Sequence, residues 1–210
     1  MLFKTATSRN IFSIVAVGVV ATVATASVLF VMSYRNMQAA SIAEMNSAAQ
    51  ISAARIEDRI AKGMQVVYTL RDAMQGLKAA NATDRAAADR MLAEIQANTP
   101  GILGVWTGWE PDAFDGRDAE FAGTTNHDAS GRYIPYATSL ADGGVNFEPL
   151  VDYETPGAGD YYLSARNARK PVIHEPFAYE VNGQSTLMTS LTAPIMAGGR
   201  VLGVAGVDLG

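Results

Sequence analysis

A run of 24 residues without a charged side chain, Ile11–Tyr34, constrains this chain more than any other feature. A helix rises about 1.5 Å per residue, so this run can cross a hydrocarbon core of roughly 30 Å. It predicts a transmembrane helix over residues 11–34. Residues 1–10 contain Lys4 and Arg9 but no acid, so we expect this short tail to stay in the cytoplasm.

A cleaved signal peptide is the alternative, because Ala24-Thr25-Ala26 resembles a small-x-small cleavage site. Apolar sequence resumes at once in residues 28–32, whereas the apolar region of a signal peptide spans only about 7–15 residues. The longer run favours an uncleaved signal anchor, with everything after Tyr34 outside the cytoplasm.

The composition of the exterior part excludes several classes of protein. It carries 14 basic and 21 acidic residues, a net charge of −7, so neither nucleic acid nor an anionic membrane surface is an expected partner. The chain has no cysteine, which excludes a disulfide framework and a thiolate metal site. Hydrophobic residues make up 49% of the chain, too many for a disordered protein.

Residues 35–80 contain no proline and have a helical pattern. We expect one long exterior helix that continues the membrane span. Its alanine-rich first half either pairs with a second copy or packs on its own domain. The apolar stripe, in steps of three and four, consists of Ile56, Ile60, Met64, Val67, Leu70, Met74 and Leu77.

A second helix is expected over residues 84–97, after the break at Asn81-Ala82. Thr83 is its predicted N-cap, and Asp84 suits its first turn. The residues expected on its apolar face are Ala87, Met91 and Ile95.

The pattern then changes to strands and turns, and the fold class is α+β with a central antiparallel sheet and the long helix behind it. Residues 157–169 predict a short helix, residues 110–123 a loop with at most one helical turn, and Gly143-Gly144 a turn. Asn182-Gly183 predicts a tight hairpin. Strands are expected at residues 102–109, 132–139, 171–181, 184–196 and 201–209.

The sequence has no phosphate-binding glycine loop and no G-x-S-x-G motif, and we do not expect an enzyme. His127 beside Asp128 and His174 beside Glu175 are acid/base candidates, but no nucleophile accompanies them. We interpret His127 as a surface loop residue and His174 as a strand residue that faces solvent.

An acidic loop remotely resembles a calcium site but lacks the spacing of one. We expect these side chains to be solvated, and we predict no metal and no cofactor. The acids are Asp112, Asp115, Asp118 and Glu120.

Aromatic residues gather between positions 106 and 179. They fit either a sheet core or the lining of a pocket for a small polar ligand, above all a cationic one. Composition alone leaves both interpretations open. The aromatics are Trp106, Trp109, Tyr133, Tyr136, Phe147, Tyr153, Tyr161, Tyr162, Phe177 and Tyr179.

Short stretches of residues 106–208 together resemble the double Cache (dCache) sensor domains of bacterial methyl-accepting chemotaxis proteins. They follow an anchor and a long helix, which is the order found in that family. The stretches are Gly108–Gly116, Gly131–Tyr136, Glu148–Glu154, Gly159–Tyr162, Glu175–Phe177, Leu187–Ser190 and Gly203–Asp208.

This resemblance implies an inner-membrane chemoreceptor, acting as a homodimer, with a PAS-like sensor outside the cytoplasm. Residues 81–210 would be the membrane-distal lobe, which binds the ligand. We expect the chain to be the N-terminal part of a longer protein. A histidine kinase or diguanylate cyclase sensor, an anchored adhesion module without signalling, and more remotely an exterior hydrolase are the alternatives.

The ligand residues of amino-acid-binding members match only in part. Their Trp-Tyr pair falls on Tyr161-Tyr162, their final Asp on Asp208, and their arginine on Gly159, while their Tyr-x-Asp falls on residues 177–179. The resemblance therefore implies an amine or a neutral heterocycle rather than an α-amino acid. The candidate ligand-binding residues are Trp106, Tyr136, Tyr153, Tyr161, Tyr162, Phe177, Tyr179 and Asp208.

Overall fold

The computed structural model describes residues 6–210, so most of the expected cytoplasmic tail, including Lys4, lies outside the described residues. The chain divides into two compact units, residues 1–56 and 57–210. One helix, α1 (Ala6–Ala79), includes residues of both units and covers the two segments that were predicted as helical.

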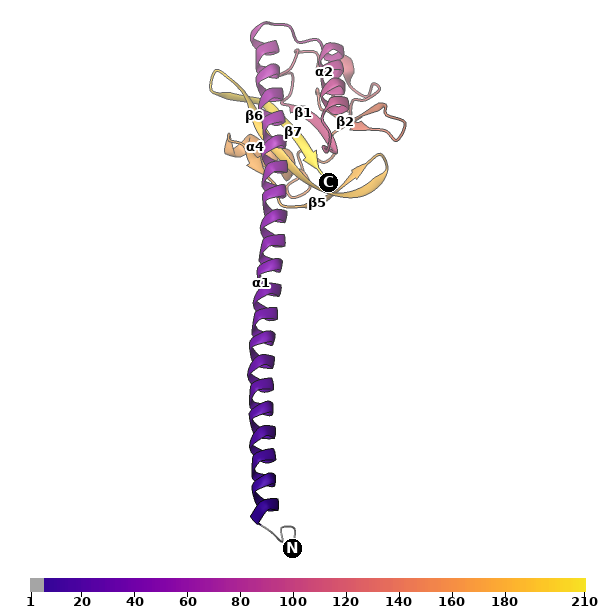
Figure 1. Ribbon diagram of the computed structural model, residues 1–210. Helices are drawn as coiled ribbons and strands as arrows, with labels where there is room; N and C mark the ends of the chain where they lie inside the picture. The colour runs from indigo at the N-terminus through magenta and orange to yellow at the C-terminus, as the bar shows by residue number, and fades with distance from the viewer. Residues whose placement is uncertain (1–5) are drawn as a thin grey trace. The chain divides into compact units, whose positions relative to one another are not determined.

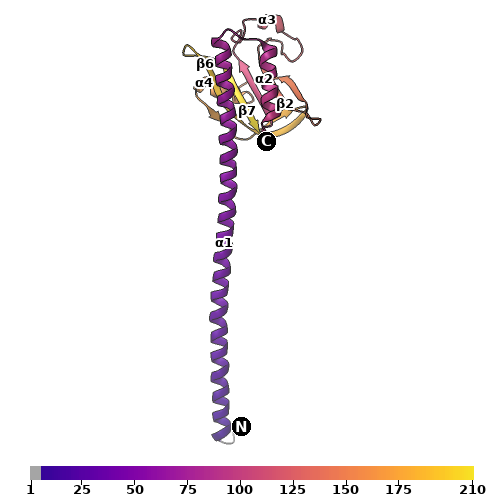
Figure 2. The same cartoon turned by 45° about the horizontal axis from the view of Figure 1, so that its top comes forward.

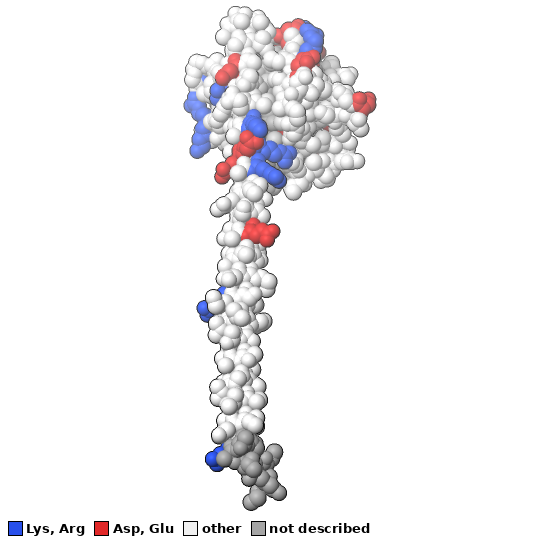
Figure 3. All heavy atoms as spheres, in the orientation of Figure 1, with Lys and Arg blue, Asp and Glu red and all other residues white. Residues whose placement is uncertain are grey.

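The described part of the first unit is helical and meets the length and composition of a membrane span. Its best window has a mean hydropathy of 2.5, and none of it is buried by other parts of the protein. The face shown in Figure 3 has a long surface without charged side chains along this helix. An apolar surface of this kind is stable in lipid rather than in water.

The second unit is built on a seven-stranded antiparallel sheet with the order β3-β2-β1-β7-β6-β4, in which β5 pairs only with β6 (Figure 1). This confirms the α+β class. The strands are β1 (Gly104–Trp109), β2 (Pro135–Ser139), β3 (Val145–Pro149), β4 (Val172–Ile173), β5 (Phe177–Val181), β6 (Gln184–Ala197) and β7 (Arg200–Leu209). The helices beside α1 are α2 (Arg85–Asn98), α3 (Asp118–Phe121) and α4 (Asp160–Ala168).

Alternate residues of the central strands build two cores on opposite faces of the sheet. On one face, Val67, Leu70 and Met74 of α1 pack with α2, which lies beside α1 in Figures 1 and 2. On the other face, α4 and β5 cover a second core that contains Trp106 and Tyr136. The predicted stripe of the long helix thus forms the first core, except that Ile56 is exposed.

Two details of α2 differ from the prediction. Asp84, not Thr83, is the N-cap, because its carboxylate accepts a hydrogen bond from the Ala87 amide at 2.6 Å. The buried face contains Ala88 and Leu92, while Ala87 is exposed. A strong cap at position 84 starts the helix one residue later than a cap at Thr83 would, and the buried face lies one position further along.

The strand predictions were wrong at three places. The second strand begins at Pro135 rather than at residue 132, and β3 was not predicted at all. The expected strand 171–181 is two strands, β4 and β5, separated by residues 174–176. Pro176 has no amide hydrogen to donate to a ladder, which accounts for a break there.

The predicted hairpin at Asn182-Gly183 is confirmed. Both residues have positive φ, 50° and 74°, as a two-residue turn between twisted strands requires. The turn sets the register in which Phe177 faces Met188 and Tyr179 faces Thr186. It thereby fixes the position of the β5 side chains over the second core.

Candidate functional site

Asp208 lies on the face of the sheet that carries the second core, in β7 and only 3% exposed. Its carboxylate accepts hydrogen bonds from the Ser190 hydroxyl at 2.5 Å and from Trp106 Nε1 at 3.3 Å. Burial raises the pKa of this carboxyl to about 6, although these hydrogen bonds favour the ionised form. Among the described residues, no cationic side chain pairs with it.

Aromatic rings from three elements surround this carboxylate. Tyr161 on α4 contacts Trp106 edge to face at 5.4 Å between ring centroids and stacks on Phe177 at 6.2 Å. Tyr179 contacts Tyr161 edge to face at 5.5 Å. About 160 Å³ of unfilled space lies among these side chains, but none of it is wide enough for a water molecule. We call this space, with Asp208, the inner site.

Two glycines allow the rings to lie flat on the sheet beside Asp208. A Cβ atom at Gly206 would lie 2.1 Å from Cε2 of Trp106, and one at Gly104 would lie 2.3 Å from Cε2 of Tyr136. Real Cβ atoms do not approach other atoms so closely, so no side chain fits at either position. The rings therefore occupy the space that side chains on β1 and β7 would otherwise fill.

The Tyr136 hydroxyl is buried and has no hydrogen-bond partner of good geometry. Burial, followed by the negative charge of Asp208, raises the pKa of this phenol well above its usual value. The hydroxyl therefore lies beside the Asp208 carboxylate, and the interaction between the two favours the protonated phenol and the ionised acid.

A second, wider pocket lies next to the inner site and shares Tyr179 with it. Its volume is about 340 Å³. We call it the outer pocket. Its lining residues are Tyr136, Glu148, Pro149, Val151, Tyr179, Glu180 and Gly183.

Tyr153 and Tyr162 belong to the second core but their hydroxyls bond elsewhere. The Tyr162 hydroxyl donates to the Glu110 carboxylate and accepts from Arg132. The Tyr153 hydroxyl donates to Asp128 at 2.8 Å. These two tyrosines therefore bond away from Asp208, whereas the five other predicted aromatic residues surround or adjoin its carboxylate. The hydroxyls of Tyr161 and Tyr179 also bond to the Val151 backbone.

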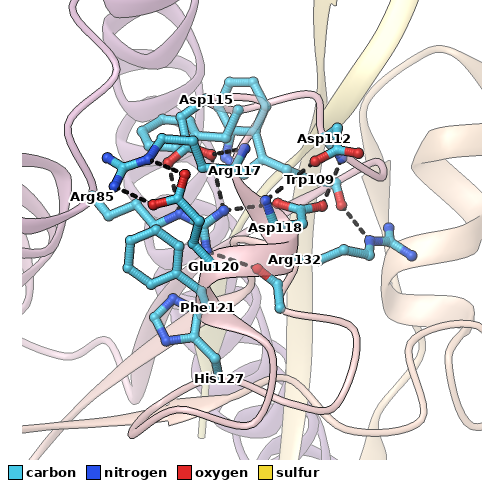
Figure 4. A network of polar contacts seen from close by, with 12 residues as sticks. Arg85, Trp109, Asp112, Asp115, Arg117, Asp118, Glu120, Phe121, His127 and Arg132 are labelled. Atoms are coloured by element: carbon cyan, nitrogen blue, oxygen red, sulfur yellow. Dashed lines mark hydrogen bonds and ion pairs between the residues drawn. The ribbon is translucent and has the colours of Figure 1, made fainter.

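The prediction of solvated acids in this loop is wrong for Asp115 and Asp118 but holds for Asp112 and Glu120, which are exposed. Asp115 and Asp118 are buried and share Arg85, at 2.9 and 2.7 Å (Figure 4). The guanidinium holds the pKa of Asp115 below its usual value despite burial. Arg85 also donates to the Gly131 carbonyl, so it connects α2 to two loops. Asp115 and Asp118 are structural, whereas Asp112 and the pair Arg117–Glu120 remain exposed.

The two histidines lie in separate places. His127 stacks beside Phe121 at 4.9 Å in a loop, as Figure 4 shows. His174 follows β4 rather than lying in a strand, is half-buried, and contacts the Thr192 hydroxyl at 3.3 Å. Burial lowers the pKa of His174. Within residues 6–210, no three His, Asp or Glu side chains are arranged to hold a metal ion.

Gly159, the position at which the resemblance would place the arginine of amino-acid-binding members, has no room for a side chain. A Cβ atom there would lie 2.3 Å from the Asp152 carbonyl oxygen. This chain therefore has no basic side chain at that position, and the local backbone leaves no room for one.

Sequence reasoning missed Ser190, Met188 and Leu150, which also line the inner site. Ser190 lies directly opposite Asp208 in the β6–β7 ladder. The two strands and their tight turn were predicted, but counting back from that turn would pair Ser190 with Val207. An irregularity between Ile195 and Met196 shifts the register by one residue and places Ser190 opposite Asp208, and the sequence gives no signal for it.

Comparison with known proteins places this chain in a family. Residues 89–210 match the family model described as "methyl-accepting chemotaxis protein-like, first PDC sensor domain". The methyl-accepting chemotaxis protein TlpQ of Pseudomonas aeruginosa is 27% identical over 131 residues, which cover 57% of this chain and 18% of that receptor.

Solved structures resemble the same region. The extracellular domain of mmHK1S-Z2, described as a histidine kinase, is 32% identical with a TM-score of 0.65, over 74% of this chain and 55% of that one. Methyl-accepting chemotaxis protein X is 28% identical with a TM-score of 0.66, over 77% of this chain and 59% of the other. The chain therefore spans little more than half of these sensor domains.

Proposed function

Because the chain belongs to the family of methyl-accepting chemotaxis protein-like first PDC sensor domains, we propose that it senses a small cationic ligand outside the cytoplasm for chemotaxis. The ligand would bind in the inner site, with Asp208 as its charged partner. Protein relatives in this family are described as sensors, which supports binding rather than catalysis.

One observation carries the proposal: the Asp208 carboxylate is buried against aromatic rings without a cation. An ionised carboxylate in such a place is unfavourable unless it is paired. The protein pairs its other buried acids, Asp115 and Asp118, with Arg85. A ligand ammonium would complete the site at Asp208, because it bonds to the carboxylate and lies against the faces of Trp and Tyr rings.

The inner site must open before a ligand enters, since its space does not admit even water. Phe177 and Tyr179 lie on β5, which pairs with β6 alone and lies off the main order of the sheet. This strand has fewer backbone bonds to break than the central ones. Ligand binding would favour an open arrangement of β5, and a sensor requires a ligand to prefer one of two states.

A thermal-shift assay on the full chain in detergent micelles tests this function. The panel contains alkylamines, amino acids, neutral heterocycles and carboxylates, with D208N as the variant and E175Q as a control at an exposed acid. A ligand at a hundredfold excess over its dissociation constant stabilises the folded state by about 2.7 kcal/mol. We expect amines to raise the midpoint of the wild type and E175Q but not of D208N. An amine response that D208N retains would disprove the site.

The arrangement in the membrane is part of the proposal. Residues 11–34 would cross the bacterial inner membrane, with residues 1–10 in the cytoplasm, and the exterior helix 35–80 would pair in a homodimer. Residues 81–210 would form the membrane-distal lobe of a double Cache sensor. The uncharged surface of α1 and the exposed Ile42 and Met45 support this arrangement.

A histidine kinase sensor is the second candidate. The 32% identity with the extracellular domain of mmHK1S-Z2 favours it as much as the chemoreceptor relatives favour chemotaxis. Sequencing of the complete reading frame separates the two. A methyl-accepting coiled coil in that reading frame would support the chemoreceptor. A kinase domain would instead support the histidine kinase sensor.

A further inference from the structure

We propose that residues 177–188, the hairpin of β5 and the first part of β6, form a lid that opens as one unit over the inner site, and that the side chains of Tyr179 and Asn182 hold it shut. We call these residues the lid. The inference rests on the proposed function only for its purpose, because the inner site is the one that the lid covers. The movement itself belongs to the protein without ligand.

The lid is a two-stranded ribbon that branches from the main sheet. β5 pairs with residues 184–188 of β6, whereas β6 pairs with β7 only from Thr189 onward. Among the described residues, no backbone hydrogen bond joins residues 177–188 to a segment outside this ribbon. An isolated two-stranded hairpin is at best marginally stable in water. The position of the lid therefore depends on its side chains.

Both ends of the lid leave the main sheet at the same place. Residues 174–176 separate β4 from β5, and Phe177 at the start of the lid pairs with Met188 at its end. Just outside the lid, the His174 amide donates to the Ser190 carbonyl at 2.9 Å and keeps the two strands together. This boundary can act as a hinge, because the backbone is fixed as far as His174 and Ser190, and beyond them the ribbon pairs only with itself.

The inner face of the lid closes the inner site. Phe177, Tyr179 and Met188 supply part of the lining of that site, and the Phe177 ring stacks on Tyr161 of α4 at 6.2 Å between centroids. The other face of the lid is open to solvent, since Leu187 is 67% exposed. An outward movement of this face therefore meets solvent rather than another element.

The outer pocket marks where the lid would part from the rest of the molecule. Tyr179, Glu180 and Gly183 line it from the lid, and residues 148–151 line it from the opposite side. Its volume of about 340 Å³ is ample for water. Water therefore reaches the edge of the lid and can compete for the hydrogen bonds there.

The Tyr179 hydroxyl is the first latch. It accepts a hydrogen bond from the Val151 amide at 3.1 Å, while the Val151 carbonyl accepts one from the Tyr161 hydroxyl at 2.6 Å. Val151 lies outside the lid, in the segment after β3, and its side chain is exposed. A hydrogen bond at the surface exchanges with water at little net cost, so this latch holds the lid weakly enough for it to open.

Asn182, at the tip of the lid, is the second latch. Its Oδ1 accepts hydrogen bonds from Asn146 Nδ2 on β3 at 2.9 Å and from Thr138 Oγ1 on β2 at 3.4 Å. Its φ of 50° suits glycine as well as asparagine, so glycine would also complete the turn. Asparagine adds an acceptor that reaches two strands of the main sheet.

Thiol labelling of the full chain in detergent micelles tests the lid, because the chain has no cysteine of its own. Ser190→Cys places a thiol beneath the lid, where Ser190 is 1% exposed. Thr107→Cys places one on the other face of the sheet, where Thr107 lies between Val105 and Trp109 of the first core and is 0% exposed. The probe is iodoacetamide. A lid that opens without global unfolding predicts much faster labelling of S190C than of T107C.

The latches are tested in the S190C background. Tyr179→Phe and Asn182→Gly should each accelerate labelling about fivefold, as expected for the loss of one hydrogen bond. Their combination should accelerate it about 25-fold, because two latches on one opening reaction add in free energy. Tyr133→Phe removes a hydroxyl from the first core, and Asn182→Asp keeps the acceptor at the tip, so both controls should label at the parent rate.

Labelling of S190C no faster than that of T107C would overturn the lid, and so would Y179F and N182G variants that label at the parent rate. A double variant no faster than the single variants would overturn one unit held by two latches.

Acrylamide quenching of tryptophan fluorescence in the cysteine-free chain is the second measurement. Of the two tryptophans, Trp106 lines the inner site, so Tyr179→Phe should increase the quenching. Unchanged quenching would contradict the lid as well. No ligand is present in either measurement, so a failure of the lid would leave the amine sensor intact, and a failure of amines to bind at Asp208 would leave the lid intact.

Discussion

Trp106 Nε1 donates a hydrogen bond to the Asp208 carboxylate at 3.3 Å, although the two residues are 102 positions apart in sequence. Ser190 donates to the same oxygen, Oδ1. Two donors from β1 and β6 thus orient a carboxylate on β7 before any ligand is present. Preorganisation of this kind strengthens binding, because the ordering of the acid does not have to be repeated when the ligand arrives.

Stability should depend on pH through Asp208. Its pKa is about 6 in the folded state, above the usual value near 4, so the protonated acid favours folding. This contribution is complete below about pH 4 and is lost as the pH rises through about 6, a change of about 3 kcal/mol. Urea unfolding between pH 4 and 7 should show the wild type losing stability relative to D208N. Parallel curves for the two proteins would contradict the raised pKa.

Ligand affinity should show the opposite dependence if the ligand is cationic. An ammonium binds the ionised acid, so protons compete with it below about pH 6. The dissociation constant should then rise about tenfold for each pH unit below the pKa. Calorimetry at pH 5, 6 and 7 measures this with a non-titrating alkylammonium probe. A ligand that binds more tightly at pH 5 would instead be a neutral molecule that bonds to the protonated acid.

Arg85→Ala should destabilise the protein strongly. It leaves Asp115 and Asp118 buried without their cation, and removal of one partner from a buried pair costs about 3–5 kcal/mol. Arg117→Ala is the matched control, because its pair with Glu120 is exposed to solvent and should contribute little to stability. Equal unfolding free energies for the two variants would mean that the Arg85 network is not structural.

Gly206→Ala should disturb the inner site. The new Cβ would lie 2.1 Å from the Trp106 ring, so the indole must move away from Asp208, at about 1–3 kcal/mol. Gly76→Ala adds the same methyl group in open space on α1, where alanine should stabilise the helix by about 0.5–1 kcal/mol. Thermal unfolding followed by tryptophan fluorescence measures both effects. A neutral Gly206→Ala variant with unchanged fluorescence would argue against the close packing of Trp106.

Tyr136→Phe should separate stability from function. The variant removes a buried hydroxyl whose neighbour Asp208 is not in good hydrogen-bond geometry, so the ligand-free protein should become more stable by about 1 kcal/mol. Amine affinity should fall at the same time, because the hydroxyl would bond to the bound ammonium. Unfolding and binding are measured on one preparation. Lower stability without loss of affinity would show that the hydroxyl has an internal partner instead.

The sequence predicted most of the fold where the signal was local. The stripe from Ile60 to Leu77, the Asn182-Gly183 turn and the final strand all follow from residues close together in the chain. β3 was missed because Val145–Pro149 is short, has a polar residue at position 146, and ends in proline. Such a strand forms because it pairs with β2, and the residues of the strand alone do not indicate this pairing.

For the candidate site, the sequence indicated which residue types gather there but not which of their polar groups have partners within the protein. The aromatic residues and Asp208 were identified, whereas Tyr153 and Tyr162 could not be distinguished from the rest. Their partners, Asp128 and Glu110, lie 25 and 52 positions away. The same limit explains the error in the acidic loop, whose cation Arg85 lies 30 residues before Asp115. Contacts between segments decide whether a polar group is structural.

Asp208 and Leu209 are consecutive residues of β7 that face opposite sides of the sheet. Leu209 belongs to the core against α1, where a Cβ at Gly63 would lie 3.6 Å from Leu209 and 2.4 Å from Leu191. The residue that carries the carboxylate of the inner site is therefore bonded directly to a residue that packs against α1. A change in the β7 backbone at Asp208 would therefore also change the surface that packs against α1.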